Sequence, residues 1–221
     1  MKKIAIMQPY FFPYLGYWQL IKSVDKFIIL DDVNFTKKSW VHRNNIISHE
    51  NPEQINLCIR KASQNKFIKD LFLSEEHNWK NKLIKKIKLA YCKSLRYEEV
   101  IPTLEEVILN KETNLSEYLF YSIEKICKLL NINTVIVPSS SKYPKRDLTG
   151  QERIIDICLR EKANAYINPM GGVSLYSKQN FKNSGILLNF IETKKGPSII
   201  DHLMNYEDDR IQKNLNQYGL I

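Results

Sequence analysis

The most chemically varied stretch of the chain is "LDDVNFTKKSWVHRNN", residues 30–45. It opens on two adjacent carboxylates, Asp31 and Asp32, which can take a proton, hold a metal ion or accept a hydrogen bond from a hydroxyl group. His42 follows, and an imidazole titrates near neutral pH, which suits a general acid or base. An exposed charged loop that turns at the two aspartates would carry the same residues. Both interpretations stay open, and the first makes Asp31, Asp32 and His42 the candidate catalytic residues.

The same stretch carries side chains suited to an anionic ligand that contains a ring. Lys38 supplies a point charge, and Arg43 can hold a phosphate or a carboxylate through two parallel hydrogen bonds. Trp40 offers a flat face on which a base or a sugar ring could stack. We therefore expect these three residues to bind substrate.

A second unusual stretch, "MQPYFFPYLGYWQLI" (residues 7–21), places aromatic rings where a first strand should pass to a first helix. Pro9 and Pro13 can continue neither a central strand nor a helix interior, so they predict a rigid, extended passage. The glycine that follows lets a backbone or a ligand approach closely. The positions that we expect to face a ligand here are Gln8, Tyr10, Tyr14, Gly16 and Tyr17.

Two later stretches could approach an anion. "PMGGVSLY" (residues 169–176) supplies Gly171, Gly172 and Tyr176, but it lacks the GxGxxG spacing and the lysine of a Walker motif, so a tight turn explains it equally well. "SSSKYPKRDLTGQE" (residues 139–152) brings Lys145 close to the expected start of a helix, where backbone amides favour anions. We count these four residues among the expected binding residues.

Each of these stretches follows a predicted strand. Short apolar runs predict strands over residues 3–7, 26–30, 54–59, 133–137, 164–169 and 186–191. Helical periodicity predicts helices over residues 15–24, 79–95, 115–130 and 151–161. The alternation predicts an α/β fold, a Rossmann-like and mainly parallel sheet flanked by helices, whose ligands bind beyond the carboxyl ends of the strands. We expect one domain over residues 1–221, with a mainly helical subdomain at about 65–130.

Composition and charge narrow the class of protein. A formal net charge of +9 over 221 residues favours an acidic partner such as a nucleotide, a nucleic acid or an anionic carrier. No apolar run is long enough for a membrane span or a signal peptide, so we expect no membrane span and a cytoplasmic location. No CxxC pair or other metal motif occurs, and Cys92, Cys127 and Cys158 are expected to be buried thiols of helices.

Four segments together resemble the WbqC-like family of bacterial proteins, in order and spacing and over nearly the whole chain: "QPYFFPYLGYWQLI", "LDDVNFTKKSWVHRN", "LTGQERIIDICLREKANAYINPMGGVSLY" and "GPSIIDHLMNY". That family occurs with genes for cell-surface polysaccharides such as O-antigen. For some members, transfer of glycine or another acyl group to a sugar has been suggested. The resemblance adds Asn44 to the expected substrate-binding residues. Similarity to nucleotidylyltransferases, which carry HxGH after the first strand, is only positional, because Tyr14 and Tyr17 stand at the two histidine places.

Three hypotheses of function follow. The first is an enzyme of surface-glycan assembly, an N-acyl or aminoacyl transferase that acts on the amino group of a nucleotide-linked amino sugar. Its acyl donor would be an aminoacyl-tRNA or an acyl carrier, although no motif identifies the donor or a cofactor. The second is ATP-dependent nucleotidyl transfer or ligation on a HUP-like fold, against which the missing histidines count. The third is a non-enzymatic protein that binds a nucleotide sugar or a nucleic acid.

Overall fold

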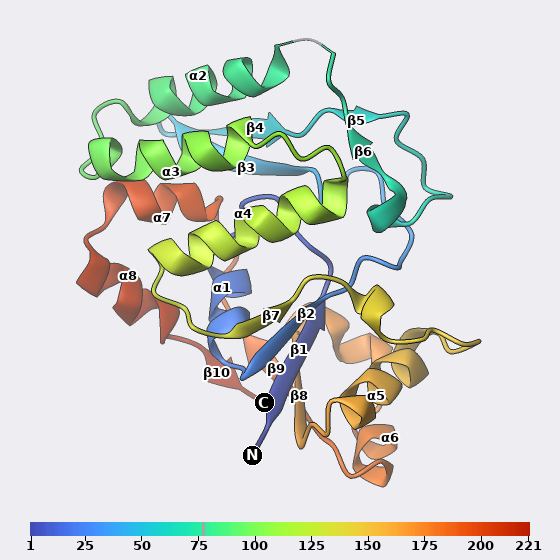
Figure 1. The fold of residues 1–221 in the computed structure, drawn as a ribbon. Coiled ribbons are helices and arrows are strands. Elements are labelled where there is room, and N and C mark those ends of the chain that lie inside the picture. Colours follow the sequence, from blue (N-terminus) through green and yellow to red (C-terminus); the bar gives the residue numbers. More distant parts are fainter. Residues whose placement is uncertain (77) are drawn as a thin grey trace.

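The computed structural model describes residues 1–76 and 78–221, and its centre is a six-stranded sheet (Figure 1). In chain order its strands are β1 (Lys3–Met7), β2 (Lys26–Ile29), β7 (Val135–Val137), β8 (Ala165–Pro169), β9 (Leu187–Glu192) and β10 (Gly219–Leu220). Across the sheet they run β10-β9-β8-β1-β2-β7, and every neighbouring pair is parallel except β9 with β10. The mainly parallel α/β sheet that the sequence predicts is confirmed.

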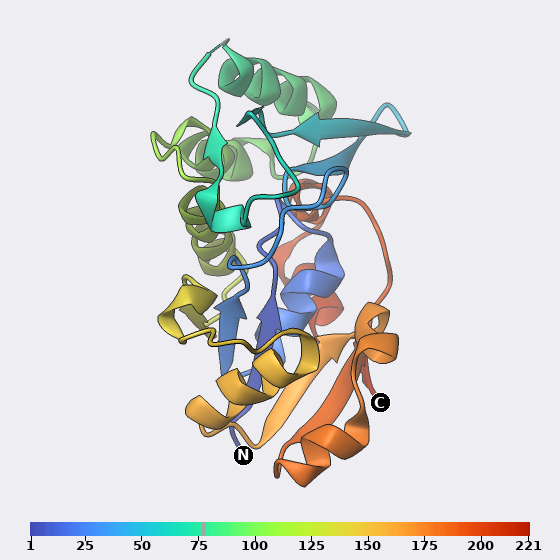
Figure 2. The same cartoon turned by 90° about the vertical axis from the view of Figure 1, so that its right-hand side faces the viewer.

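Helices cover both faces of this sheet (Figure 1 and Figure 2). One face carries α1 (Leu15–Lys22) and α8 (Asp208–Leu215), and the other carries α5 (Gly150–Arg160) and α6 (Lys178–Asn183). The helix before α8, α7 (Ile199–Asn205), lies above the sheet in Figure 1. The central strands must therefore bury side chains on both sides. β1 does so with a period of two, because Ala5 packs on the α1 side whereas Ile4 and Ile6 pack on the α5 side.

The chain between β2 and β7 builds a separate layer beyond the carboxyl ends of these strands, at the top of Figure 1. It holds two antiparallel strand pairs, β3 (Arg43–Ser48) with β4 (Asn51–Asn56) and β5 (Ile59–Arg60) with β6 (Phe72–Leu73). Its helices are the short η1 (Ile68–Asp70), α2 (Trp79–Tyr91), α3 (Tyr97–Leu109) and α4 (Leu115–Leu129). Three long helices thus fall within residues 65–130, where the sequence predicts a mainly helical subdomain. Two more short 3-10 helices, η2 (Ser140–Lys142) and η3 (Met170–Leu175), follow β7 and β8.

Some local predictions differ from the structure. The sequence predicts one loop over residues 31–45, whereas Arg43 already begins β3, because the polar start of "RNNIIS" hides the strand. It also predicts a buried Cys92, but this thiol is exposed at the end of α2. Cys127 and Cys158 are buried as expected, and burial raises the pKa of each thiol to about 12. Neither thiol is therefore a nucleophile at neutral pH.

At the amino edge of the sheet, Glu161 joins three donors from separate elements. Its carboxylate lies 2.6 Å from the Lys26 ammonium, 2.9 Å from the Lys2 ammonium and 2.5 Å from the Tyr143 hydroxyl. Burial acts to raise the pKa of Glu161, but the hydrogen bonds from Lys26, Tyr143 and Lys2 outweigh it and hold the pKa at about 2. The ionised group therefore fastens β1 and β2 to the end of α5.

Among the described residues, no helix combines the length and the apolar character that crossing a membrane requires.

Candidate functional site

A crevice opens at the carboxyl edge of the sheet, between the ends of β1 and β8. From β1 the chain continues to β2 on one side, whereas from β8 it continues to β9 on the other. Neighbouring parallel strands whose connections diverge leave a gap above the sheet, and α/β proteins bind their ligands at this point. Here the gap is a cavity of about 340 Å³. Its walls come from β1 and the turn that follows it, from Leu30 after β2, and from β8 with η3.

Five of the residues that the sequence predicts to bind substrate line this crevice: Gln8, Tyr10, Gly171, Gly172 and Tyr176. Burial, with a smaller effect of Tyr14, raises the pKa of Tyr10 to about 12. Burial also raises the pKa of Tyr176. Both phenols therefore stay protonated near neutral pH and can donate hydrogen bonds. The crevice offers ring faces and neutral polar groups to a ligand.

Asn168, near the end of β8, lines the crevice but does not stand out as a binding residue in the sequence. It is buried, and its Oδ1 accepts a hydrogen bond from the Tyr166 hydroxyl at 3.0 Å. Gly172 lies directly against it, because a Cβ at Gly172 would be 1.9 Å from Asn168 Nδ2. Only glycine lets the turn close on this amide. A polar residue just before the proline of the buried strand "AYINP" is the signal that could have identified it.

Asp31 lies at the next gap, between the ends of β2 and β7. Its Oδ1 accepts hydrogen bonds from the Ser139 hydroxyl at 2.8 Å and the Ser140 amide at 3.1 Å. Its Oδ2 accepts one from the Ser116 hydroxyl of α4 at 2.8 Å. The buried carboxylate thus ties α4 and the loop after β7 to the end of β2. Both oxygens are thus engaged by donors of the protein itself.

Asp32 pairs with Arg153 of α5, whose Nη2 lies 3.3 Å from Asp32 Oδ2, and the two side chains are only 6% and 5% exposed. The same guanidinium donates to the carbonyl oxygens of Ser140 at 3.1 Å and Tyr143 at 2.7 Å. A buried ion pair with these extra bonds fixes the loop after β7 against α5. Neither Asp31 nor Asp32 is among the residues that line the crevice, although both are at the same edge of the sheet.

Lys145, which the sequence predicts to bind an anion, lies beside this network. Its ammonium is 3.2 Å from the Asp32 carbonyl oxygen and 4.7 Å from the centre of the Phe67 ring. The Lys69 ammonium is 6.0 Å from the same ring, and it donates to the Ser141 hydroxyl at 3.0 Å. Two ammonium groups therefore lie near the same aromatic ring, close to the end of β2. Nothing in the sequence singles out Lys69 or Phe67, which lie in a polar stretch without periodicity.

The remaining residues of the 37–43 loop lie apart from the crevice lining. Lys38 is exposed with a left-handed φ of +64°, and the Arg43 guanidinium donates to its carbonyl oxygen at 2.5 Å. Trp40 is 45% exposed, so its ring face is open to a partner. His42 is half-buried, with its ring centre 5.2 Å from that of Phe35. Burial, then the charge of Arg43, lowers the pKa of His42, so the imidazole is neutral at pH 7.

Asn44 connects this loop to the aromatic turn. Its buried side-chain amide donates to the carbonyl oxygens of Phe11 at 3.1 Å and Phe12 at 2.7 Å. The Ser198 hydroxyl donates to the same Phe12 oxygen at 2.8 Å. Phe12 has a left-handed φ of +40°, which a phenylalanine seldom adopts, so these bonds hold an unfavourable conformation. Asn44 therefore positions the turn that carries the crevice residues.

The start of α1 is packed closely as well. A Cβ at Gly16 would be 2.3 Å from Thr193 Oγ1 and 2.5 Å from the Tyr14 ring, so glycine is required here by protein contacts. Tyr17 is buried, and its hydroxyl donates to the Gln8 carbonyl oxygen at 2.9 Å. Tyr14, Gly16 and Tyr17 thus support the turn, and none of the three is part of the crevice lining.

Comparison with known proteins shows the family of the chain. The model of the WbqC-like protein family matches residues 8–213, which include the aspartate network and the crevice residues from Gln8 onward. The uncharacterized protein Rv1507c of Mycobacterium tuberculosis is 27% identical over 194 residues, which cover 87% of this chain and 83% of that protein. No solved structure gives a significant match. The chain belongs to the WbqC-like protein family.

Proposed function

We propose that the crevice between β1 and β8 binds a nucleotide-linked amino sugar, and that the protein is a surface-glycan enzyme that transfers an acyl or aminoacyl group to the sugar's amino group. The observation that carries this proposal is the position of the crevice where the connections of β1 and β8 diverge. Its volume of about 340 Å³ suits part of such a ligand, since small-molecule sites in proteins measure roughly 300–1,000 Å³.

The lining supports a ligand with rings and hydroxyl groups. Tyr10 and Tyr176 offer faces for a base or a sugar, and the amides of Gln8 and Asn168 offer hydrogen bonds to hydroxyls. A diphosphate would extend along the edge of the sheet toward Lys145 and Lys69, beside the end of β2. Ammonium groups suit this role as point charges.

In the proposed step, the amine nitrogen attacks the carbonyl carbon of the acyl donor. A C–N bond forms, the bond from that carbon to the oxygen or sulfur of the donor breaks, and the amine loses a proton. Asp31 and Asp32 are held in hydrogen bonds and an ion pair, so we assign them positioning roles. His42 is the remaining candidate base, and because it lies outside the crevice lining, this role requires the amino sugar to extend from the crevice toward the 37–43 loop. The donor is an aminoacyl-tRNA or an acyl thioester, in keeping with the charge of +9.

The strand order also favours a second candidate, ATP-dependent nucleotidyl transfer, because a parallel sheet of this order binds nucleotides at the same edge. Nucleotidyl transfer would be favoured by cationic side chains at the start of α1, such as the histidines of an HxGH motif. Tyr14 and Tyr17 stand there instead, and Tyr17 is buried with its hydroxyl bonded to Gln8. The geometry therefore ranks this candidate below acyl transfer.

Calorimetric titration with UDP-glucosamine tests the proposal. We expect binding, and we expect Gln8→Ala to weaken it about fivefold because one hydrogen bond contributes about 1 kcal/mol. Gln64→Ala is the matched control, since it removes the same groups from an exposed residue of the 61–66 segment. Turnover is then followed by mass spectrometry with glycyl-tRNA and with acetyl-CoA as donors.

An N-acylated sugar product that His42→Asn abolishes, with UDP-glucosamine binding intact, would support acyl transfer. Binding that Gln8→Ala and Gln64→Ala leave equally unchanged would place the ligand outside the crevice. If only ATP binds and pyrophosphate is released on turnover, nucleotidyl transfer replaces acyl transfer.

A further inference from the structure

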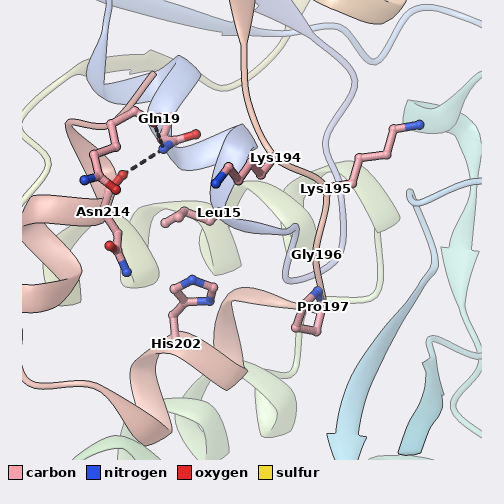
Figure 3. A pocket seen from close by; sticks show the side chains of 9 residues that line it. Leu15, Gln19, Lys194, Lys195, Gly196, Pro197, His202 and Asn214 are labelled. Atoms are coloured by element: carbon pink, nitrogen blue, oxygen red, sulfur yellow. Dashed lines mark hydrogen bonds between the residues drawn. The ribbon is translucent and has the colours of Figure 1, made fainter. Parts of the chain in front are cut away.

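A second cavity of about 590 Å³ lies among α1, α7 and α8, on the α1 side of the sheet (Figure 3). Its walls are α1, the loop after β9 over residues 193–197, α7 and the end of α8. It is lined by Leu15, Gln19, Lys194, Lys195, Gly196, Pro197, His202, Asn214 and Gln217. None of the predicted binding residues lines this cavity, and the proposed function does not involve it.

The charges around this cavity favour an anion. Its ionisable side chains are Lys194, Lys195 and His202, and no carboxylate is among the described residues that line it. In Figure 3 the His202 ring points into the cavity and Lys194 extends over it toward Gln19, whereas Lys195 points away. Lys194 is thus the ammonium best placed to meet an anionic group inside.

Gln19 supplies a hydrogen-bond acceptor that nothing satisfies. Its Nε2 donates to the carbonyl oxygens of Asn214 at 2.7 Å and Gln217 at 2.9 Å, which fixes the orientation of the amide. Its Oε1 is then directed away from α8, and it has no hydrogen-bond partner among the described residues although Gln19 is only 3% exposed. A buried acceptor without a donor is unfavourable, and a ligand hydroxyl, or the Lys194 ammonium drawn inward by an anion, would satisfy it.

His202 adds a neutral polar group to the same cavity. Burial, opposed by Asp201 and assisted by Arg210 of α8, lowers the pKa of His202. The uncharged ring can both donate and accept a hydrogen bond at neutral pH, and its Nδ1 has no partner among the residues described. A ring of this kind suits a hydroxyl group of the ligand.

We propose that this cavity binds a monosaccharide phosphate, with Lys194 on the phosphate and with Gln19 and His202 on hydroxyl groups. Side-chain amides with a small apolar surface from Leu15 and Pro197 fit a sugar ring. Among the described residues that line it, none is Phe, Tyr or Trp, on which a nucleobase would stack. The site is separate from the crevice and does not depend on the function proposed for it.

Calorimetric titration of the full chain with glucose 1-phosphate tests the site, with glucose and inorganic phosphate as partial ligands. We expect Lys194→Gln to weaken binding of glucose 1-phosphate about tenfold, because a hydrogen bond to a charged group contributes about 1.5–3 kcal/mol. Lys195→Gln is the matched control, since it makes the same charge change on the neighbouring side chain that points away. Both lysines are exposed, so neither variant should change the melting temperature. His202→Asn should also weaken binding, and Gln8→Ala in the crevice should leave it unchanged.

Several results would overturn the proposal. Absence of binding refutes it directly. Equal losses in Lys194→Gln and Lys195→Gln would mean that net charge alone attracts the phosphate. If Gln8→Ala weakens the binding of glucose 1-phosphate, the ligand binds in the crevice instead. If inorganic phosphate binds as tightly as glucose 1-phosphate, the sugar contributes nothing to binding and the site is not one for a sugar phosphate.

Discussion

Replacing Asn44 by alanine tests whether this residue positions the aromatic turn or contacts substrate. The substitution removes two donated bonds, to the carbonyl oxygens of Phe11 and Phe12, and the bond of 2.8 Å that Asn44 Oδ1 accepts from the Asn45 amide. Phe12 keeps its bond from Ser198, whereas Phe11 loses the side-chain donor that satisfied its oxygen. A lost hydrogen bond costs about 1 kcal/mol and an unsatisfied buried carbonyl about 1–3 kcal/mol, so we expect a loss of about 3 kcal/mol in the free energy of unfolding.

Urea denaturation followed by tryptophan fluorescence measures this loss, and a melting curve should shift down by about 6–12 °C for a chain of this size. Asn45→Ala is the matched control, because it removes the same side-chain groups from a half-buried residue. Asn44, whose amide holds the turn, stays in place. Ser198→Ala alone should cost about 2 kcal/mol, because its hydroxyl donates to the Phe12 oxygen and also caps α7 by accepting from the Ile200 amide. The double variant should cost more than the sum, because the Phe12 oxygen then loses both of its donors. If Asn44→Ala unfolds like wild type but no longer binds UDP-glucosamine, Asn44 contacts the ligand and our reasoning is wrong.

Two further predictions concern the buried charges. Because the pKa of Glu161 is held at about 2, below its value in the unfolded chain, its stabilisation is complete above about pH 4.5 and is lost as the pH falls toward 2. Glu161→Gln should therefore cost on the order of 2 kcal/mol at pH 7 and little at pH 2, measured by urea denaturation at both pH values; an equal cost at both would contradict this. Arg153→Met should cost about 3–5 kcal/mol by leaving Asp32 unpaired, and adding Asp32→Asn should recover part of that loss. No recovery in the double variant would show that the other bonds of Arg153, to Ser140 and Tyr143, dominate.

The sequence predicts the central sheet well because its strands are continuous apolar runs bounded by helices. β1 was predicted with the bounds that the structure gives, Lys3–Met7, and β8 differs by one residue at its start. The edge at which we propose ligand binding follows from this order of elements, and five predicted residues meet in the crevice there.

What the sequence could not provide depends on contacts between distant segments. Two carboxylates at the end of a strand are visible in the sequence, but Ser116 and Arg153, which engage them, lie far along the chain. Asn44 appears as one polar residue among several, since its burial depends on the turn at Phe11 and Phe12. For the same reason, the cavity beside His202 cannot be read from local patterns, because its walls come from α1 and from residues 194–217, which lie far apart in the sequence.

The pairing of the central strands has a consequence for biosynthesis. β1 and β2 leave the ribosome well before their partners, because Lys26 pairs with Val135 and Lys3 pairs with Ala165. At roughly 5–20 residues per second, the partner strands emerge about 5 to 30 seconds later. During that time two apolar strands have unpaired edges that can recruit other nascent chains. The layer built between β2 and β7 is synthesised in that interval, but it lies beyond the carboxyl ends of the strands, so it leaves these edges uncovered until β7 and β8 pair with them.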